Sequence, residues 1–241
     1  GENFNRHYAD VAPRAAELLA PRLSSGAPVD LAEARAALRQ ACEQLKADTE
    51  LQSLRRTLLG LAIDAETVLD LHCDNEAVLH LYTVPAVWPA VEPLARLTGS
   101  RAVLLADVSG DEPFDEACST VWSRLATALT AQLGRTVELS AACVAVTVEL
   151  RGDRDVAHEL AQADAEALLR YLAWRGYIAG PPETLPALAC EPTPLAGSLP
   201  VIAPLGGVLV HACPLGATVR RGELLAEIVD PLGGTVTRLE S

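Results

Sequence analysis

The chain has 241 residues, of which 50% are hydrophobic and 21% are charged, and its formal net charge is −13. A surface this acidic repels phosphate groups, so we expect no nucleic acid partner and no anionic membrane partner. No apolar run approaches the roughly 20 residues of a membrane span, and no basic-then-apolar leader is found, which favours a cytoplasmic protein. The six cysteines form no CxxC pair, so we expect reduced thiols.

After a polar loop at 1–8, helical periodicity dominates the first quarter of the chain, and short apolar runs then alternate with helical patterns. Strands that alternate with helices predict an α/β domain with a mixed central sheet flanked by helices. The predicted helices are 9–23, 30–46, 50–62, 88–98, 114–132 and 153–174. The predicted strands are 67–71, 77–82, 101–106 and 143–150.

The composition changes after Ile178. Six prolines fall within residues 181–200, too many for a helix or a central strand. We therefore predict an α/β domain at 1–178, a Pro-rich linker at 179–200 and a small module at 201–241. Short Val, Ile and Leu runs alternate with Gly and Pro turns in this module, so it is predicted to be all-β.

Two polar residues stand at the ends of predicted strands, where functional residues gather in open α/β sheets. His72 directly follows the strand at 67–71, and Glu149 lies near the end of the strand at 143–150. An imidazole on a rigid strand is suited to binding zinc, and a glutamate beside a metal-bound water is suited to act as a general base. Taken alone, a single histidine is more often structural, and a strand-end glutamate is more often a surface charge.

Three motifs occur in a fixed order: Asn3-Phe-Asn-Arg6, Asp70-Leu-His-Cys-Asp74 and Thr147-Val-Glu-Leu-Arg-Gly152. Together with the β module, they resemble the succinylglutamate desuccinylase/aspartoacylase family of zinc carboxypeptidase-like hydrolases. The resemblance implies a zinc carboxypeptidase-like sheet with a C-terminal barrel-sandwich-like module. It also implies a zinc-dependent deacylase that cleaves the amide bond of an N-acyl amino acid or a related carboxylated amide.

The same resemblance implies a role for each matching residue. His72 corresponds to the second zinc-binding histidine of the family. Glu149 corresponds to the general base that activates water and later protonates the leaving amine. Arg6, with Asn5, corresponds to the pair that holds a substrate carboxylate, a task for which a planar guanidinium is better suited than an ammonium group.

The chain departs from the family pattern at its zinc ligands. Family members take two ligands from a His-x-x-Glu motif upstream of the Asn-Arg pair, and this sequence contains no His-x-x-Glu. It also contains no methionine. We therefore expect a processed, split or engineered chain in which the N-terminal part of the catalytic domain and the remaining ligands are absent. Whether such a chain binds zinc unaided, or is active alone, stays open.

Several neighbouring residues have two interpretations. His80 and Tyr82 lie two apart on one strand face, so they either line the pocket or form a buried hydrogen-bonded pair. Arg151 either shapes the pocket near Glu149 or caps the following helix.

Three further polar residues lie within the motifs or beside them. Asp74 either orients His72 or forms a turn. His7 is a substitute ligand or a solvated loop residue. To Asp70 we assign no role.

The β module resembles lipoyl and biotinyl domains, but it contains no lysine, which excludes carriage of a swinging arm. It is instead a candidate cap over the active site or a contact in a homo-oligomer. Two rival functions remain open: a non-catalytic or truncated family member that binds a small carboxylate or a protein partner, and a metallocarboxypeptidase.

Overall fold

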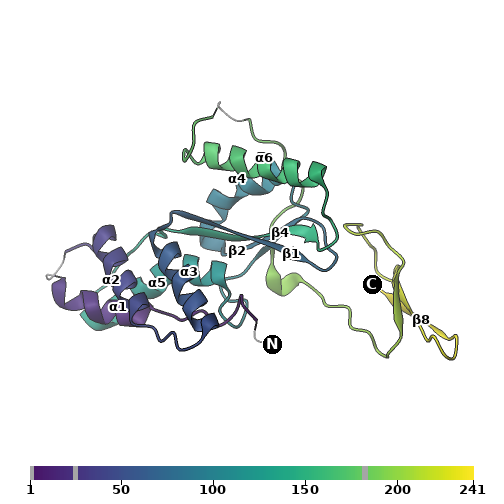
Figure 1. Cartoon of the computed structure of the whole chain (residues 1–241), viewed down its shortest axis with the longest axis horizontal. Helices are drawn as coiled ribbons and strands as arrows, with labels where there is room; N and C mark the ends of the chain where they lie inside the picture. The colour runs from purple at the N-terminus through teal and green to yellow at the C-terminus, as the bar shows by residue number, and fades with distance from the viewer. Residues whose placement is uncertain (1–2, 24–26, 181–183) are drawn as a thin grey trace.

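A mixed sheet of five strands, in the order β1-β4-β2-β3-β5, forms the centre of the computed structural model, which describes residues 3–23, 27–180 and 184–241 (Figure 1). β4 runs parallel to β1 and antiparallel to β2, while β2 and β3 are parallel. The predicted mixed α/β fold is therefore confirmed. The strands are β1 (Thr67–Asp74), β2 (His80–Thr83), β3 (Ala102–Leu105), β4 (Val144–Gly152) and β5 (Thr193–Pro194).

Two layers of helices cover the two faces of this sheet (Figure 1). α4 and α6 pack on one face, and α5 packs on the other together with a bundle of α1, α2 and α3. The helices are α1 (Ala12–Leu19), α2 (Leu31–Glu43), α3 (Glu50–Asp64), α4 (Trp88–Thr98), α5 (Phe114–Leu133) and α6 (His158–Trp174). Short 3-10 turns lie at Ala20–Arg22, Pro85–Val87 and Leu195–Gly197. No helix within the described part of the chain is long and apolar enough to cross a membrane.

The alternation of side chains along β4 assigns each face of the sheet its own core. Val144, Val146 and Val148 pack with α4 and α6, whereas Ala145 belongs to the cluster formed with α5. Side chains in a strand point to opposite faces with a period of two, so Thr147 and Glu149 share the face of Ala145. The α5 face of the sheet therefore carries the polar residues of β4.

Most predicted elements occur within a few residues of their expected bounds, and the differences have local causes. β1 continues three residues beyond 71, so His72 lies within the strand rather than after it. α6 starts at His158 because Asp155 closes a turn, in which its backbone N–H donates to Gly152 O and its carboxylate accepts from Gly152 N at 2.9 Å. The six cysteines are all unpaired.

The segment predicted as a linker contributes to the main sheet. Thr193 and Pro194 form β5, which pairs with β3 at the sheet edge, a position where the missing N–H of proline is tolerated. Residues 181–183 of the predicted linker, like residues 1–2 of the predicted loop, lie outside the described residues.

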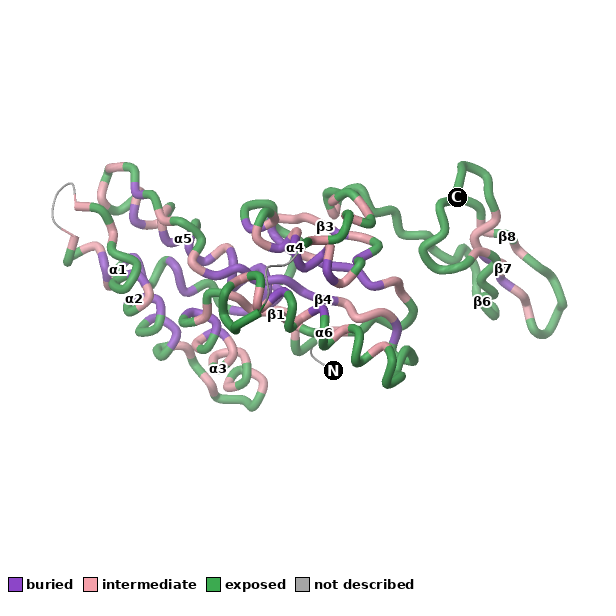
Figure 2. Tube along the Cα trace, turned by 90° about the horizontal axis from the view of Figure 1, so that it is seen from above, coloured by how far each residue is buried: buried purple, intermediate pink, exposed green. Residues whose placement is uncertain are grey.

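The C-terminal residues form a separate three-stranded antiparallel sheet in the order β6-β7-β8. Most of its residues are exposed, as Figure 2 shows, and its buried hydrophobic side chains are Ala226 and Ile228 on β7. The strands are β6 (Val208–His211), β7 (Leu224–Val229) and β8 (Val236–Glu240).

Candidate active site

Strand register brings the polar residues of the predicted motifs together. β1 pairs with β4 so that Asp70 lies opposite Thr147 and His72 lies opposite Glu149. β2 pairs with the other side of β4 and places His80 opposite Glu149. Residues opposite each other in adjacent strands share a face, so these side chains all stand on the α5 face of the sheet.

A cavity of about 420 Å³ opens on this face. Arg6, His72 and Glu149 all line it, although they lie on three segments far apart in the sequence. The other residues that line it include Asn3, Asn5, Tyr82, Thr83, Ser109, Asp115, Glu116, Thr147 and Leu195.

His72 is held by two neighbours. Its Nε2 lies 2.9 Å from Oδ2 of Asp70 and 3.2 Å from Nδ2 of Asn5, which itself donates to Asp70 at 3.3 Å. The hydrogen bond with Asp70 raises the pKa of His72 above its usual value, although partial burial opposes this shift. The structure therefore corrects the expectation that Asp70 takes no part in the site, because residues two apart on a strand share a face.

The carboxylate of Glu149 has one oxygen that is buried inside the protein. Its Oε2 is buried and accepts no hydrogen bond from any residue that the structure describes. Burial raises the pKa of Glu149, while the nearby His72 and His80 lower it. A carboxylate with a raised pKa and an uncommitted oxygen can accept a proton more readily than an ordinary surface glutamate.

Asn5 connects the N-terminal segment to the site. Its side-chain oxygen accepts from the backbone N–H of Phe114 at 2.9 Å, which ties the segment to the first turn of α5. The backbone carbonyl oxygen of Asn5 accepts a hydrogen bond from Nη1 of Arg6 at 2.6 Å. The guanidinium of Arg6, which lines the cavity, is thus held by the backbone carbonyl of the preceding residue.

The remaining predicted residues divide between the cavity and its surroundings. Tyr82 lines the cavity, and its ring meets that of His80 edge-on at a centroid distance of 5.2 Å. His80 is buried and donates from Nδ1 to the carbonyl of Val78 at 2.8 Å, and it packs against Tyr82 without lining the cavity itself. Arg151 does not line the cavity, because it pairs with Asp164 on α6, and we do not carry it into the proposed site.

Asp74 and His7, the other two candidates, do not line the cavity. Asp74 accepts a hydrogen bond from the backbone N–H of the next residue at 2.7 Å, as a turn-forming aspartate does. His7 is exposed, and its backbone N–H donates to Asp111 O.

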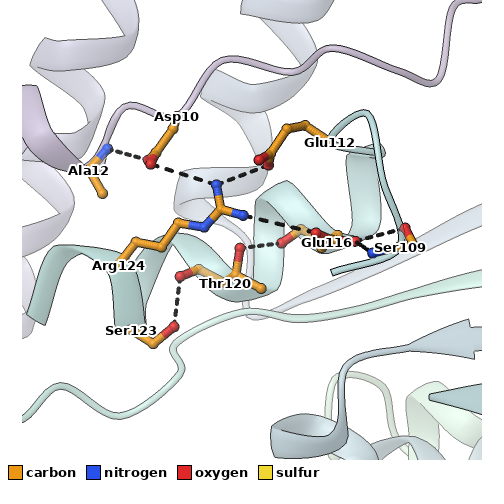
Figure 3. Close-up of polar contacts among 8 residues, drawn as sticks. All are labelled: Asp10, Ala12, Ser109, Glu112, Glu116, Thr120, Ser123 and Arg124. Atoms are coloured by element: carbon orange, nitrogen blue, oxygen red, sulfur yellow. Dashed lines mark hydrogen bonds and ion pairs between the residues drawn. The ribbon is translucent and has the colours of Figure 1, made fainter. Parts of the chain in front are cut away.

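Two acidic residues of the cavity were not anticipated from the sequence. Asp115 and Glu116 lie in the first turn of α5 and are only 6% and 3% exposed. Figure 3 shows Glu116 between Ser109 and Arg124. Burial raises the pKa of Asp115 to about 6. Acidic residues in a first helical turn usually complement the helix dipole at the surface, so the sequence carries no signal that these two are buried.

The donor set can be compared with the needs of zinc. Structural and catalytic zinc sites are usually tetrahedral, with at least three ligands from the protein. Within the described ranges, no three His, Cys, Asp or Glu side chains are grouped so as to hold a metal ion. His72 offers one suitable nitrogen, but these residues do not by themselves form a complete zinc site.

No protein-family model and no curated protein matches the chain significantly. Solved structures do match. A succinylglutamate desuccinylase/aspartoacylase family protein from Shewanella amazonensis SB2B aligns with a TM-score of 0.77 and 26% identity over 100% of this chain and 66% of its own. A succinylglutamate desuccinylase/aspartoacylase from Shewanella frigidimarina NCIMB 400 aligns with a TM-score of 0.75 and 27% identity. This alignment covers 100% of this chain and 64% of the Shewanella frigidimarina chain. A succinylglutamate desuccinylase from Silicibacter sp. TM1040 aligns with a TM-score of 0.60 over 98% of this chain and 74% of its own. Its sequence identity is 15%, so this likeness shows the fold alone.

Proposed function

We propose that this chain, which belongs to the succinylglutamate desuccinylase/aspartoacylase family, hydrolyses the amide bond of an N-acyl amino acid or a related carboxylated amide. The observation that supports the proposal most strongly is the single cavity lined by Arg6, His72 and Glu149. The chain spans 66% and 64% of the two Shewanella proteins, so the activity of the whole protein is part of the proposal.

Each of the three side chains has a distinct task in this scheme. Arg6 binds the substrate carboxylate through paired N–H groups and so fixes the position of the amide bond. Glu149 takes a proton from the attacking water and then delivers it to the nitrogen of the leaving amine. Burial of Glu149 favours this cycle, because a raised pKa makes the carboxylate a stronger base for water and keeps its proton available for transfer.

His72 is the described residue that we propose as a zinc ligand. Zinc, when bound, supplies polarisation of the amide carbonyl and a lower pKa for water. Asp70 would then orient the His72 ring, as carboxylates commonly do for metal-binding histidines.

Acyl release by the purified protein tests the proposal. We expect Glu149→Gln to lower the rate about 100-fold or more, because it removes the base while keeping the size of the side chain. Glu166→Gln is the matched control, since Glu166 is exposed on α6 and contacts Gln162 rather than the cavity. Equal rates for wild type and Glu149→Gln would refute the assignment.

The incomplete donor set favours a second candidate, in which the chain binds a small carboxylate at Arg6 without cleaving it. The zinc content of the purified protein separates the two candidates. A hydrolase should retain about one zinc per chain. A protein with no zinc that still binds N-acyl amino acids would be a carboxylate-binding member of the family.

A further inference from the structure

The two faces of the C-terminal sheet differ in how far they are covered. Side chains alternate along β7, so the buried Ala226 and Ile228 point to one face, while Glu227 and Val229 point to the other and are only partly buried. The sheet stands apart from the α/β domain, and most of its residues are exposed (Figure 2). The face of Glu227 and Val229 is therefore the less protected one.

Strand register extends this less protected face over all three strands, because residues opposite each other in paired strands share a face. One row across the sheet consists of Val208, Val229 and Val236, and the next row consists of Val210, Glu227 and Arg238. We call these six residues the valine face. Its three valines on the outer strands, Val208, Val210 and Val236, are 54%, 45% and 52% exposed.

The polar contacts between the module and the α/β domain do not use the valine face. Nε2 of His211 lies 3.4 Å from Oε2 of Glu76, and the carbonyl oxygen of Gly216 accepts from Nη2 of Arg101 at 3.1 Å. His211 lies opposite Ala226 in the register with β7, so it points to the other face of the sheet. None of the six valine-face residues takes part in either contact.

An uncovered face of this kind is unfavourable for a small module. Three-stranded sheets normally require one well-packed apolar face, and the other face of this sheet buries only Ala226 and Ile228 among its hydrophobic residues. Adjacent exposed valines on a regular sheet form a contiguous apolar surface, which in soluble proteins commonly marks a contact with another protein.

The distribution of charge indicates which partner fits. Residues 201–241 contain three arginines and four acidic residues, a net charge of −1, so residues 1–200 carry −12 of the total of −13. The valine face itself carries one acid and one base, Glu227 and Arg238. A face with one charge of each sign is neutral and can be complementary to a second copy of itself.

The positions of the two charges suit a two-fold contact. Glu227 and Arg238 are neighbours on β7 and β8, opposite each other in the register. A two-fold axis that runs between β7 and β8 would place Glu227 over Arg238 of a second copy, and Arg238 over Glu227 of that copy. The same axis would stack Val229 on Val236 in both directions, as in two sheets that pack face to face.

We propose that two copies of the chain associate through their valine faces into a small β-sandwich. The four valines supply the apolar contact, and the two reciprocal Glu227–Arg238 ion pairs fix the register. Because the face is only two rows deep, the contact is smaller than a standard interface. We therefore expect a weak dimer, with a dissociation constant of about 10–100 µM.

Sedimentation equilibrium of the full chain, from about 5 µM to 1 mM, tests the proposal. The buffer contains about 0.15 M salt, which screens the repulsion between the two acidic α/β domains. The wild type should dimerise, and Val210→Asp should be monomeric because its carboxylate would be buried without a partner. Val156→Asp is the matched control, since Val156 is 87% exposed in the α/β domain, and it should dimerise as the wild type does.

Charge reversal distinguishes this contact from any other self-association. Glu227→Arg and Arg238→Glu each place like charges across the proposed two-fold axis, so each alone should weaken the dimer about tenfold or more. An equimolar mixture of the two variants pairs opposite charges at both positions. The mixture should recover an affinity within about threefold of wild type, although each sheet still holds two like charges of its own.

Three results would overturn the proposal: a wild type that stays monomeric up to about 1 mM, a Val210→Asp variant that dimerises like wild type, or a mixture that associates no better than its components. Circular dichroism confirms that each variant keeps its fold. Where a reversal variant does not fold, Glu227→Gln and Arg238→Gln replace the pair. Each of these neutral variants should weaken the dimer about threefold, and an unchanged affinity in both would equally contradict the proposed ion pairs.

Discussion

Nε2 of His72 lies 2.9 Å from Oδ2 of Asp70, two residues earlier on the same strand. The contact follows from strand geometry, because alternate residues share a face. It raises the pKa of His72, and the stabilisation it provides is present at low pH and is lost as the pH rises through that raised pKa.

We predict that Asp70→Asn lowers the pKa of His72, since the variant removes both the charged hydrogen-bond acceptor and the nearby negative charge. An NMR titration of the histidine side chains in protein treated with a chelator measures this change. Asp74→Asn on the same strand is the control and should leave the pKa of His72 in place. An unchanged pKa in Asp70→Asn would contradict the assigned pairing.

The buried Asp115 predicts a pH-dependent stability. Its pKa in the folded protein is about 6, raised from 3.8 chiefly by burial, so the folded state favours the protonated form. Stability is therefore lost as the pH rises from about 4 to 6, by at most about 3 kcal/mol. Relative to wild type, Asp115→Asn should gain stability over this interval.

Urea denaturation at the two ends of the pH interval measures the gain. The exposed Asp107→Asn serves as the control, and its difference from wild type should be small at both ends. An Asp115→Asn difference that is the same at both pH values would show that Asp115 is not the titrating group.

Gly152 closes β4 three residues after Glu149, opposite Asp74, where the register with β1 shifts. A Cβ at this position would lie 2.9 Å from the carbonyl oxygen of Asn75 and 3.3 Å from the Cα of Glu76. Backbone atoms cannot move aside as a flexible side chain can, so Gly152→Ala should destabilise the fold by roughly 1–3 kcal/mol.

Gly60 offers a matched comparison within α3. An added Cβ there meets only Sγ of Cys42, at 3.8 Å, so Gly60→Ala should stabilise the protein by about 0.5–1 kcal/mol through the lower backbone entropy of alanine. Urea unfolding of both variants measures the contrast. A stabilising Gly152→Ala would contradict the close packing of β4 against the loop after β1.

Local sequence patterns predicted the elements well because their causes are local. The third helix is an example: Thr49 accepts from the backbone N–H of Gln52 at 3.2 Å, and the Gln52 side chain accepts in return from the backbone N–H of Thr49, also at 3.2 Å. The motifs likewise indicated Arg6, His72 and Glu149, which the structure places in one cavity.

Long-range pairing could not be predicted in the same way. The register that sets His72 beside Glu149 joins strands separated by more than sixty residues, and no local signal fixes it. Glu116 was missed for the same reason, because its burial depends on Ser109 and on the packing of α5 against the sheet. Asp70 was within reach of the sequence, since a spacing of two on a strand already predicts a shared face.

The central claim is that one cavity anchors a carboxylate at Arg6 and cleaves an amide with Glu149. Its most direct test is acetate release from an N-acetyl amino acid and from the same compound with its carboxylate converted to a neutral amide. We predict that kcat/KM favours the carboxylate about tenfold or more, that Arg6→Gln abolishes this advantage, and that Glu149→Gln suppresses hydrolysis of both compounds. An advantage that persists in Arg6→Gln, or hydrolysis by Glu149→Gln at the wild-type rate, would contradict the claim.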